Sequence, residues 1–235
     1  MKFLIKHIYE SYGKNRYIIK GNKSLIVRLH TFIFSSSLLI KIIFGVKIDD
    51  SLHNRNLPHK NKRNLPHKYD ITTILLKNYL KNIINKNNKK LKVLEIGTGY
   101  YGILSIYLKK KFDVDIVATD LDPKAIKSTK LNLNINNVKI GAFDSNLFQN
   151  INYFDFDIIF WNLPYYRKVE NYLVPLIEQS DQYLSQNGKL ILGYNSSPLN
   201  YETVIEISKK NKKLTYDNTV LYSWNQHAIS VIKKN

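Results

Sequence analysis

The sequence predicts an α/β fold in which a largely parallel sheet is wrapped by helices and preceded by a small N-terminal α/β attachment. Three observations predict it. From Leu91 onward, short apolar runs rich in Val and Ile alternate with stretches of helical periodicity, as in repeated strand–helix units. The first unit joins its strand to its helix through a glycine-rich turn, Gly97–Gly102. The chain has 235 residues, 44% of them hydrophobic, which is enough to bury the core of one such domain with a smaller attachment.

Residues 1–68 are expected to form the basic attachment and a linker, and residues 69–235 the main domain. Near the boundary a hexapeptide, Arg-Asn-Leu-Pro-His-Lys, occurs at 55–60 and again at 63–68. Two copies of so short a unit do not make a repeat protein, and the prolines indicate an exposed connection. We therefore place the boundary within this stretch.

The main domain begins with a predicted helix over Ile71–Ile84, for which Asp70 or Thr72 is the candidate N-cap. The strands expected after it are Lys92–Ile96, Asp115–Thr119, Val138–Phe143, Phe156–Trp161 and Lys189–Gly193, followed by a closing antiparallel pair at 214–222 and 227–232. The helices expected between them are Gly102–Lys111, one that starts at Pro123, Asn171–Ser185 and Tyr201–Lys210.

The positive charge of the chain is concentrated in its N-terminal part. The net charge is 36 − 18 = +18, of which residues 1–90 carry 19 − 4 = +15 and residues 91–235 carry 17 − 14 = +3. A polyanion such as RNA would be attracted to the N-terminal third, with binding that weakens as salt rises. The alternative is compositional, because the chain is rich throughout in Lys, Asn, Ile and Tyr.

The absence of cysteine excludes disulfides and Cys-based zinc sites, and it fits a cytoplasmic protein. The first residues turn polar too soon for a signal peptide. The run Leu29–Val46 has almost the length of a membrane span, but it contains Lys41 and three serines. We expect it to form a buried or interfacial helix, and we expect no integral membrane span. No group of residues at ligand spacing indicates a metal site.

Polar residues stand at the end of each predicted parallel strand, where ligands bind in sheets of this kind. The first strand ends in the glycine turn, whose Gly97 and Gly99 allow the backbone to turn sharply and approach a ligand. Asp120 follows the second strand, where an acid can bond both hydroxyls of a ribose, and Asp144 follows the third. The fourth strand runs into Asn162-Leu163-Pro164-Tyr165. Taken alone, the glycine pattern is also compatible with a tight turn that binds nothing.

Together these motifs resemble those of class I S-adenosylmethionine-dependent methyltransferases, over about residues 70–235. More narrowly, the chain resembles the branch that methylates amino groups on planar systems. That branch includes nucleic-acid base N-methyltransferases and release-factor glutamine methyltransferases. It implies a Rossmann-like, seven-stranded methyltransferase sheet and S-adenosyl-L-methionine as cofactor. The cofactor-binding residues that it implies are Glu95, Gly97, Thr98, Gly99, Gly102, Asp120, Leu121, Asp144, Ser145 and Asn162.

The resemblance implies Asn162, Pro164 and Tyr165 as catalytic residues. The Asn162 side-chain carbonyl and the Leu163 backbone carbonyl can accept hydrogen bonds from a substrate amine and aim its lone pair at the methyl donor. Pro164 stiffens the turn, and Tyr165 offers an aromatic face to a flat acceptor. Leucine at the second motif position is similar to ribosomal-RNA adenine dimethyltransferases, but only about 40 residues follow the fifth strand here, too few for their extra C-terminal domain.

The acceptor predicted from these features is an amino group of an RNA base, reached through the basic N-terminal third. A protein glutamine, or a small molecule or peptide, is the alternative acceptor. A nicotinamide enzyme fits the glycines and Asp120 as well, but Glu95, Asp144 and the Asn-Leu-Pro-Tyr motif weigh against it. A cofactor-binding subunit without activity is opposed by the intact motif at Asn162.

Overall fold

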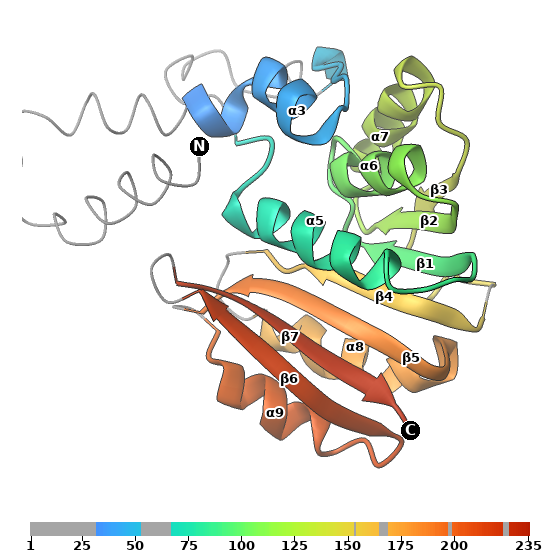
Figure 1. Ribbon diagram of the computed structural model, residues 1–235, viewed down its shortest axis with the longest axis vertical. Coiled ribbons are helices and arrows are strands. Elements are labelled where there is room, and N and C mark those ends of the chain that lie inside the picture. The colour runs from blue at the N-terminus through green and yellow to red at the C-terminus, as the bar shows by residue number, and fades with distance from the viewer. Residues whose placement is uncertain (1–31, 53–66, 153, 165–168, 197–198, 223–225) are drawn as a thin grey trace, which may run out of the picture.

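The computed structural model describes residues 32–52, 67–152, 154–164, 169–196, 199–222 and 226–235. Its centre is a seven-stranded sheet in the order β3-β2-β1-β4-β5-β7-β6. The strands are β1 (Leu91–Ile96), β2 (Val114–Asp120), β3 (Gly141–Asp144), β4 (Phe156–Asn162), β5 (Leu184–Asn195), β6 (Leu214–Tyr222) and β7 (His227–Lys234). The first five strands run parallel, and β7 lies antiparallel between β5 and β6 (Figure 1). The predicted α/β class and seven-stranded Rossmann-like sheet are confirmed.

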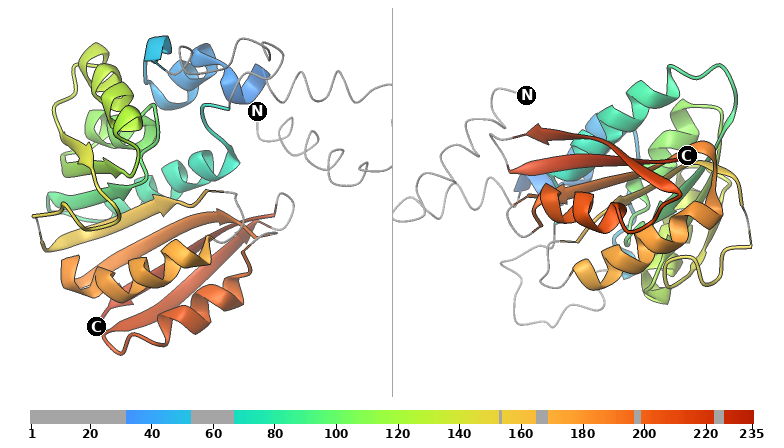
Figure 2. Two further views of the ribbon diagram at one scale, coloured as in Figure 1. Left: turned by 180° about the vertical axis from the view of Figure 1, so that it is seen from behind. Right: turned by 90° about the horizontal axis from the view of Figure 1, so that it is seen from below.

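Helices cover both faces of this sheet (Figures 1 and 2). The helices are α3 (Ser37–Phe44), α5 (Ile71–Ile84), α6 (Ile103–Lys111), α7 (Pro123–Ile135), α8 (Glu170–Tyr183) and α9 (Tyr201–Ser208). Successive side chains of a strand point to opposite faces. Val93 accordingly joins the core beneath α5 and α6, whereas Leu94 joins the core beneath α8 and α9. The strand order reverses between β1 and β4, so a crevice opens there at the carboxyl ends of the strands.

Two predicted strands begin several residues away from where they begin in the structure, whereas the other bounds differ by at most two residues. β3 begins at Gly141 rather than at Val138, because the Val138 backbone N–H donates to the Leu133 carbonyl and closes the end of α7. β5 begins at Leu184, within the predicted helix 171–185, and includes the predicted turn 186–188. The pairing of β4 with β5 shifts between Phe156 and Ile158, so an irregularity in the ladder accommodates the extra residues of β5.

The described part of the N-terminal segment packs against the main domain. Ile40 and Phe44 of α3 are fully buried in the same core as α5 and α6, and the Phe44 ring meets the Tyr107 ring edge-on at 6.4 Å between centroids. Gly45 ends α3 in the left-handed conformation. The division of the chain at residue 68 stays a prediction, and residues 32–52 are in contact with both α6 and α7.

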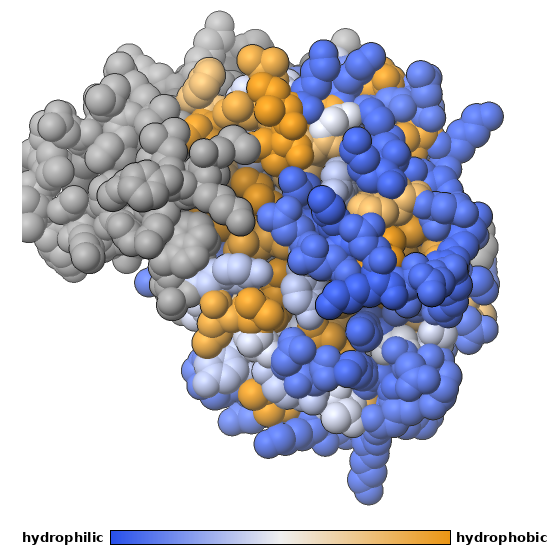
Figure 3. All heavy atoms as spheres, viewed as in Figure 1, coloured by the Kyte–Doolittle hydropathy of each residue, from blue (hydrophilic) through white to orange (hydrophobic). Residues whose placement is uncertain are grey.

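Two apolar side chains of α3, Leu38 and Ile42, and that of Phe32 before the helix are each exposed by more than 60%. Hydrophobic residues gather over this part of the surface in Figure 3. Within the described ranges, no helix has both the length and the apolar character that crossing a membrane requires.

Asn136 fixes the segment that follows α3. Its side-chain oxygen accepts from the Lys47 backbone N–H at 2.9 Å, and its side-chain nitrogen donates to the Lys47 carbonyl at 2.7 Å. Asn136→Ala leaves both backbone groups of Lys47 without these bonds, so we expect a loss of about 1–3 kcal/mol in the free energy of unfolding. Urea denaturation measures the loss. Asn134→Ala is the matched control, because Asn134 is exposed on α7, the helix that ends just before Asn136. Equal denaturation midpoints for the two variants would contradict the role of Asn136.

Candidate active site

The glycine turn between β1 and α6 forms the floor of the site. Gly97, Gly99 and Gly102 all have positive φ, of 63°, 69° and 60°. At Gly97 a Cβ would also overlap the indole nitrogen of Trp161, and at Gly102 it would lie 2.8 Å from Cγ2 of Thr129. The turn is therefore closed against β4 on one side and against α7 on the other. Only glycine combines this backbone conformation with so close an approach.

Glu95 is a fully buried carboxylate directly beneath this turn. Its Oε2 accepts hydrogen bonds from the Thr98 hydroxyl at 2.9 Å, from the Ser105 backbone N–H at 3.1 Å and from the Ser105 hydroxyl. Burial raises the pKa of Glu95 to about 7, although the bonds from Ser105 and Thr98 oppose the rise. Glu95 thus joins the end of β1 to the first turn of α6 and fixes the path of the glycine turn.

The raised pKa of Glu95 makes a prediction about stability. Between its ordinary value of 4.5 and about pH 7, the folded protein keeps a proton that the unfolded chain releases. The free energy of unfolding therefore falls as pH rises through that window, by an amount on the order of 3 kcal/mol from this group, and is constant above it. Glu95→Gln removes this titration, so thermal melts from pH 4.5 to pH 8 should show the variant gaining relative to wild type up to pH 7. Parallel curves would contradict the assignment.

Asp120 stands at the end of β2, opposite the turn. One carboxylate oxygen accepts from the Gly99 backbone N–H at 2.8 Å, and the other accepts from the Asp122 backbone N–H at 2.9 Å. Burial raises the pKa of Asp120, while these two bonds favour its charged form. Each oxygen retains a second lone pair, so the carboxylate can also accept from the two hydroxyls of a ribose.

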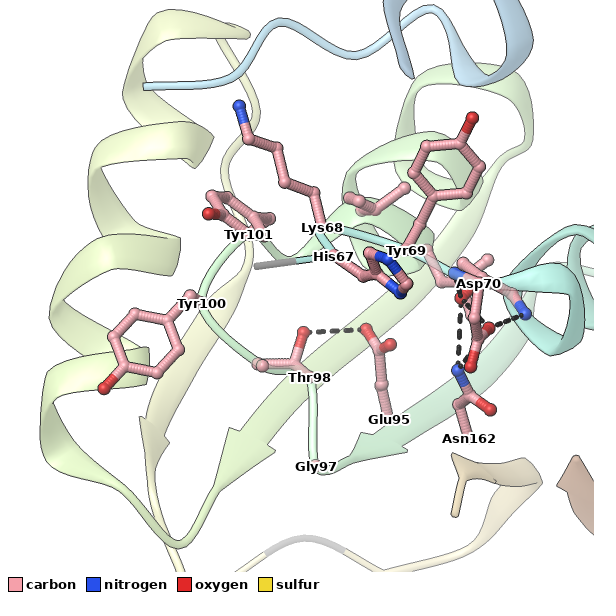
Figure 4. Close-up of a pocket in the computed structure, with 14 residues that line it drawn as sticks. His67, Lys68, Tyr69, Asp70, Glu95, Gly97, Thr98, Tyr100, Tyr101 and Asn162 are labelled. Atoms are coloured by element: carbon pink, nitrogen blue, oxygen red, sulfur yellow. Dashed lines mark hydrogen bonds between the residues drawn. The ribbon is translucent and has the colours of Figure 1, made fainter. Parts of the chain in front are cut away.

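Two cavities meet at Gly97 and Asn162, which line both. The larger, of about 320 Å³, is lined by the glycine turn, by Glu95 and by the segment that enters α5 (Figure 4). Its remaining lining includes His67, Lys68, Tyr69, Asp70, Thr73, Tyr100 and Tyr101. The smaller, of about 160 Å³, is lined by Asp120, by apolar side chains and by Ser145. A cofactor with a charged amino-acid end and a nucleoside end fits this division, because charged groups surround one cavity and Asp120 with apolar side chains surrounds the other.

Asn162 is held between the cavities with a defined orientation. Its side-chain nitrogen donates to the Asp70 carboxylate at 3.2 Å and to the Thr73 hydroxyl at 3.1 Å. Its side-chain oxygen is buried and has no hydrogen-bond partner within the described structure. An unpaired buried acceptor is costly, so this oxygen is a ready partner for the N–H of a ligand. The Leu163 backbone N–H donates to the Gly193 carbonyl at 2.8 Å and anchors the motif to β5.

The structure brings together most of the side chains predicted for the site. Glu95, Thr98 and the turn glycines Gly97 and Gly99 line the larger cavity; Leu121, Ser145 and Pro164 line the smaller; Asn162 lines both. Three predicted residues are not gathered in this way. Gly102 belongs to the glycine turn but lines neither cavity. Asp144 pairs with Asp120 across β2 and β3, but its exposed side chain lines neither cavity. Tyr165 lies outside the described residues.

Three of the residues that were not predicted for the site make contacts that shape it. Asp70 was expected only as a helix cap, and Thr73 was not singled out, yet both bond Asn162. Trp161 was expected only as a strand residue, yet its ring closes against Gly97 and lines the smaller cavity. The available signal was position, since Asp70 precedes a helix and Trp161 directly precedes the Asn-Leu-Pro-Tyr motif.

The sheet order and the glycine turn beneath two cavities match the class I methyltransferase fold that the motifs predict. The chain belongs to the methyltransferase small domain family, whose model matches residues 66–220. A solved methyltransferase from Pyrococcus furiosus superposes with a TM-score of 0.66 at 21% identity, covering 91% of this chain and 98% of that one. A Thermus thermophilus 16S rRNA N2 G1207 methyltransferase, solved with S-adenosylmethionine and guanosine, gives a TM-score of 0.57 at 20% identity, over 72% of this chain and 44% of that one. These two likenesses concern the fold.

Curated relatives match parts of the chain at higher identity. A Methanocaldococcus jannaschii protein, provisionally named a protein N5-glutamine methyltransferase, is 42% identical over 99 residues, covering 40% of this chain and 48% of the relative. Ribosomal RNA small subunit methyltransferase C of Buchnera aphidicola is 37% identical over 117 residues, covering 47% of this chain and 35% of the relative. The matched region thus spans less than half of the length of either relative.

Proposed function

We propose that this protein is an S-adenosylmethionine-dependent N-methyltransferase that acts on the amino group of a planar acceptor. The observation that carries the proposal is the buried side-chain oxygen of Asn162, which has no hydrogen-bond partner among the described residues and belongs to a residue that lines both cavities. A planar amine or amide N–H is the complementary donor. The amide orientation that leaves this oxygen available is fixed by Asp70 and Thr73.

The roles of the remaining residues follow from their positions. Asp120 would accept from the ribose hydroxyls, with Leu121 and Ser145 beside the nucleoside base. The backbone at Gly97 and Gly99 would pass beneath the amino-acid end. S-adenosylmethionine, when bound, supplies a methyl group already activated by its sulfonium. The chain's own contribution is then to exclude water and to aim the acceptor nitrogen, with Asn162 accepting its N–H.

The acceptor that we propose is a base in RNA. The basic N-terminal third supports this choice, since residues 1–90 carry a net charge of +15. A relative named as a ribosomal RNA methyltransferase shares 37% identity over part of the chain. Protein glutamine is the second candidate, because the 42% identical relative is named for that acceptor and a primary amide presents the same planar N–H. A small molecule or peptide remains the third.

One assay separates these acceptors. Labelled methyl groups from S-adenosylmethionine are offered with the full chain to total RNA, ribosomes, protein extract and small-molecule extract in parallel. Label in RNA that appears as an N-methylated base supports the proposal, and label confined to protein glutamine supports the second candidate. S-adenosylhomocysteine should raise the thermal midpoint, and NADH should not. A response to NADH alone would end the methyltransferase proposal.

A truncation tests whether the N-terminal charge binds RNA. Residues 32–52 are packed against α6 and α7, so only residues 1–31, which carry 7 − 1 = +6, should be removed. We expect RNA affinity of the full chain to fall steeply between about 50 and 200 mM salt, and the slope against log salt to become shallower after truncation. An unchanged slope would contradict the role of residues 1–31. Unchanged unfolding of the truncated chain confirms that the fold is intact.

A further inference from the structure

Asp70 and Thr73 form a small polar network behind Asn162. The Asp70 carboxylate is the N-cap of α5, and its Oδ1 accepts from the Thr73 backbone N–H and from the Thr73 hydroxyl, both at 2.7 Å. The same oxygen accepts from the side-chain nitrogen of Asn162 at 3.2 Å. One carboxylate oxygen therefore serves both the helix end and the amide, as Figure 4 shows.

The hydrogen-bond inventory of this network allows one orientation of the Asn162 amide. A carboxylate only accepts hydrogen bonds, and the single hydroxyl hydrogen of Thr73 is already donated to Asp70. Both groups that face Asn162 therefore present lone pairs, so the amide must turn its nitrogen toward them. The flipped amide would set its oxygen against two other oxygens and would lose both hydrogen bonds. The carbonyl oxygen of Asn162 is thereby directed to the opposite side, where no described residue bonds it.

Asp70 is itself held from the N-terminal side. The Lys68 backbone N–H donates to the Phe34 carbonyl at 2.8 Å, and the Tyr69 hydroxyl donates to the Ile33 carbonyl at 2.8 Å. Tyr69 is buried in the core that contains α3 and α6. The residues that precede α5 are thus hydrogen-bonded to the described N-terminal segment. These bonds fix the position of the Asp70 carboxylate relative to β4.

We propose that Asp70, with Thr73, is a positioning residue that locks the Asn162 amide with its carbonyl oxygen toward the acceptor. This inference rests on the proposed N-methyltransferase function for its consequence in catalysis, but the orientation itself is a property of the chain. In this orientation the Asn162 side chain accepts a hydrogen bond from the methyl acceptor and donates none to it. A methyl-acceptor nitrogen that carries an N–H can therefore bind beside Asn162, whereas a nitrogen that presents only a lone pair cannot.

The test compares Asp70→Ser, Asp70→Asn and Thr73→Val in the full chain. Serine keeps the N-cap but is too short to reach Asn162, whereas asparagine keeps an oxygen at that position. We expect kcat for methyl transfer to fall by about 10–100-fold in Asp70→Ser, less in Thr73→Val, and to recover largely in Asp70→Asn. The dissociation constant for S-adenosylhomocysteine should rise by a smaller factor than kcat falls, because the glycine turn and Asp120 are unchanged even though Asp70 and Thr73 line the larger cavity. A fall confined to cofactor affinity would mean that Asp70 acts on the cofactor, and the inference would be wrong.

A second readout does not depend on activity. The two side-chain NH₂ proton resonances of Asn162, assigned by comparison with Asn162→Ala, should show contacts to the Thr73 side chain in wild type and lose them in Asp70→Ser. If the wild-type protein shows the contacts between Asn162 and Thr73 but transfers methyl groups to no acceptor, the proposed function is wrong and the proposed orientation of Asn162 is retained. If the protein transfers methyl groups but the Asn162 contacts are the same in Asp70→Ser as in wild type, the role of Asp70 is wrong and the proposed function is retained.

Asp181→Ser is the matched control. Asp181 is a carboxylate that, like Asp70, accepts from an asparagine side chain: it accepts from Asn211 at 3.2 Å and pairs with Lys213 at 3.3 Å, on the opposite face of the sheet from Asp70. Its loss should lower the thermal midpoint without changing kcat at a temperature where the protein stays folded. An equal drop in kcat for Asp181→Ser would show that the effect of Asp70→Ser is general destabilisation.

Discussion

Asn162→Ala should lower kcat for methyl transfer by about 10²–10³-fold, the cost of removing one aligned hydrogen-bonding group from a closed site. The side-chain oxygen of Asn162 is a buried acceptor without a partner among the described residues, and Asn162 lines both cavities. Cofactor affinity should change far less, because Asp120, the glycine turn and the backbone of the motif stay in place. Steady-state kinetics together with calorimetric binding of S-adenosylhomocysteine measure the two effects separately.

Asn162→Asp sharpens this prediction. The aspartate keeps an acceptor oxygen, but it sets a second carboxylate against Asp70, where the wild-type nitrogen and oxygen are 3.2 Å apart. Like charges at that separation repel, so one of the two carboxyl groups should take up a proton and the side chain should move. We therefore expect the aspartate variant to be impaired at neutral pH, despite its oxygen, and to recover in part at lower pH. Wild-type activity in either variant would remove Asn162 from the mechanism.

Gly97→Ala should abolish cofactor binding and reduce the free energy of unfolding by about 2–4 kcal/mol. The positive φ of 63° costs an alanine about 1 kcal/mol, and overlap with the Trp161 ring adds the cost of overpacking, about 1–3 kcal/mol. The methyl group would lie 2.9 Å from Cδ1 of the indole, so either the turn or Trp161 must shift. Both line the cavities, and binding suffers with stability. Urea denaturation and cofactor calorimetry are the measurements.

Gly99→Ala is the matched control for the clash. Gly99 has nearly the same φ, 69°, but nothing lies within 4 Å of the Cβ that would be added there. It should cost only the conformational part, about 1 kcal/mol. In the background of Trp161→Leu, which removes the indole, Gly97→Ala should then cost no more than Gly99→Ala. Equal costs for the two alanines in the wild-type background would show that contact with Trp161 does not matter.

The strand–helix order was predictable because its signals are local. The alternation of apolar runs, the turn glycines and Asp70 as the cap of α5 each depend on a few neighbouring residues. Positions at the carboxyl ends of parallel strands are also forced together by the sheet itself, which is why Glu95, Asp120 and Asn162 could be assigned to one edge. The start of β5 was not predictable, because it depends on how the ladder with β4 shifts past Phe156.

The contacts that complete the site could not be predicted from local sequence signals. Asn162 and Asp70 are separated by 92 residues along the chain and meet only because α5 crosses the end of β4. The contact of Gly97 with Trp161 likewise depends on neighbouring strands. Asp144 satisfied the same strand-end rule as Asp120 and is its register partner, yet its side chain is exposed and lines neither cavity, because it stands on the edge strand β3, one strand further from the crevice between β1 and β4.

The contact between the N-terminal segment and the main domain has a consequence for how this enzyme can be subdivided. The family match begins at residue 66, whereas Phe34, Ile40, Phe44 and Val46 fill the core beside Tyr69 and Tyr107. A polypeptide cut at the family boundary would expose that apolar surface to water and would lose the anchors of Tyr69. Recombinant production of residues 66–235 alone should therefore give aggregates, and the smallest unit worth expressing or swapping into a related enzyme begins before Phe34.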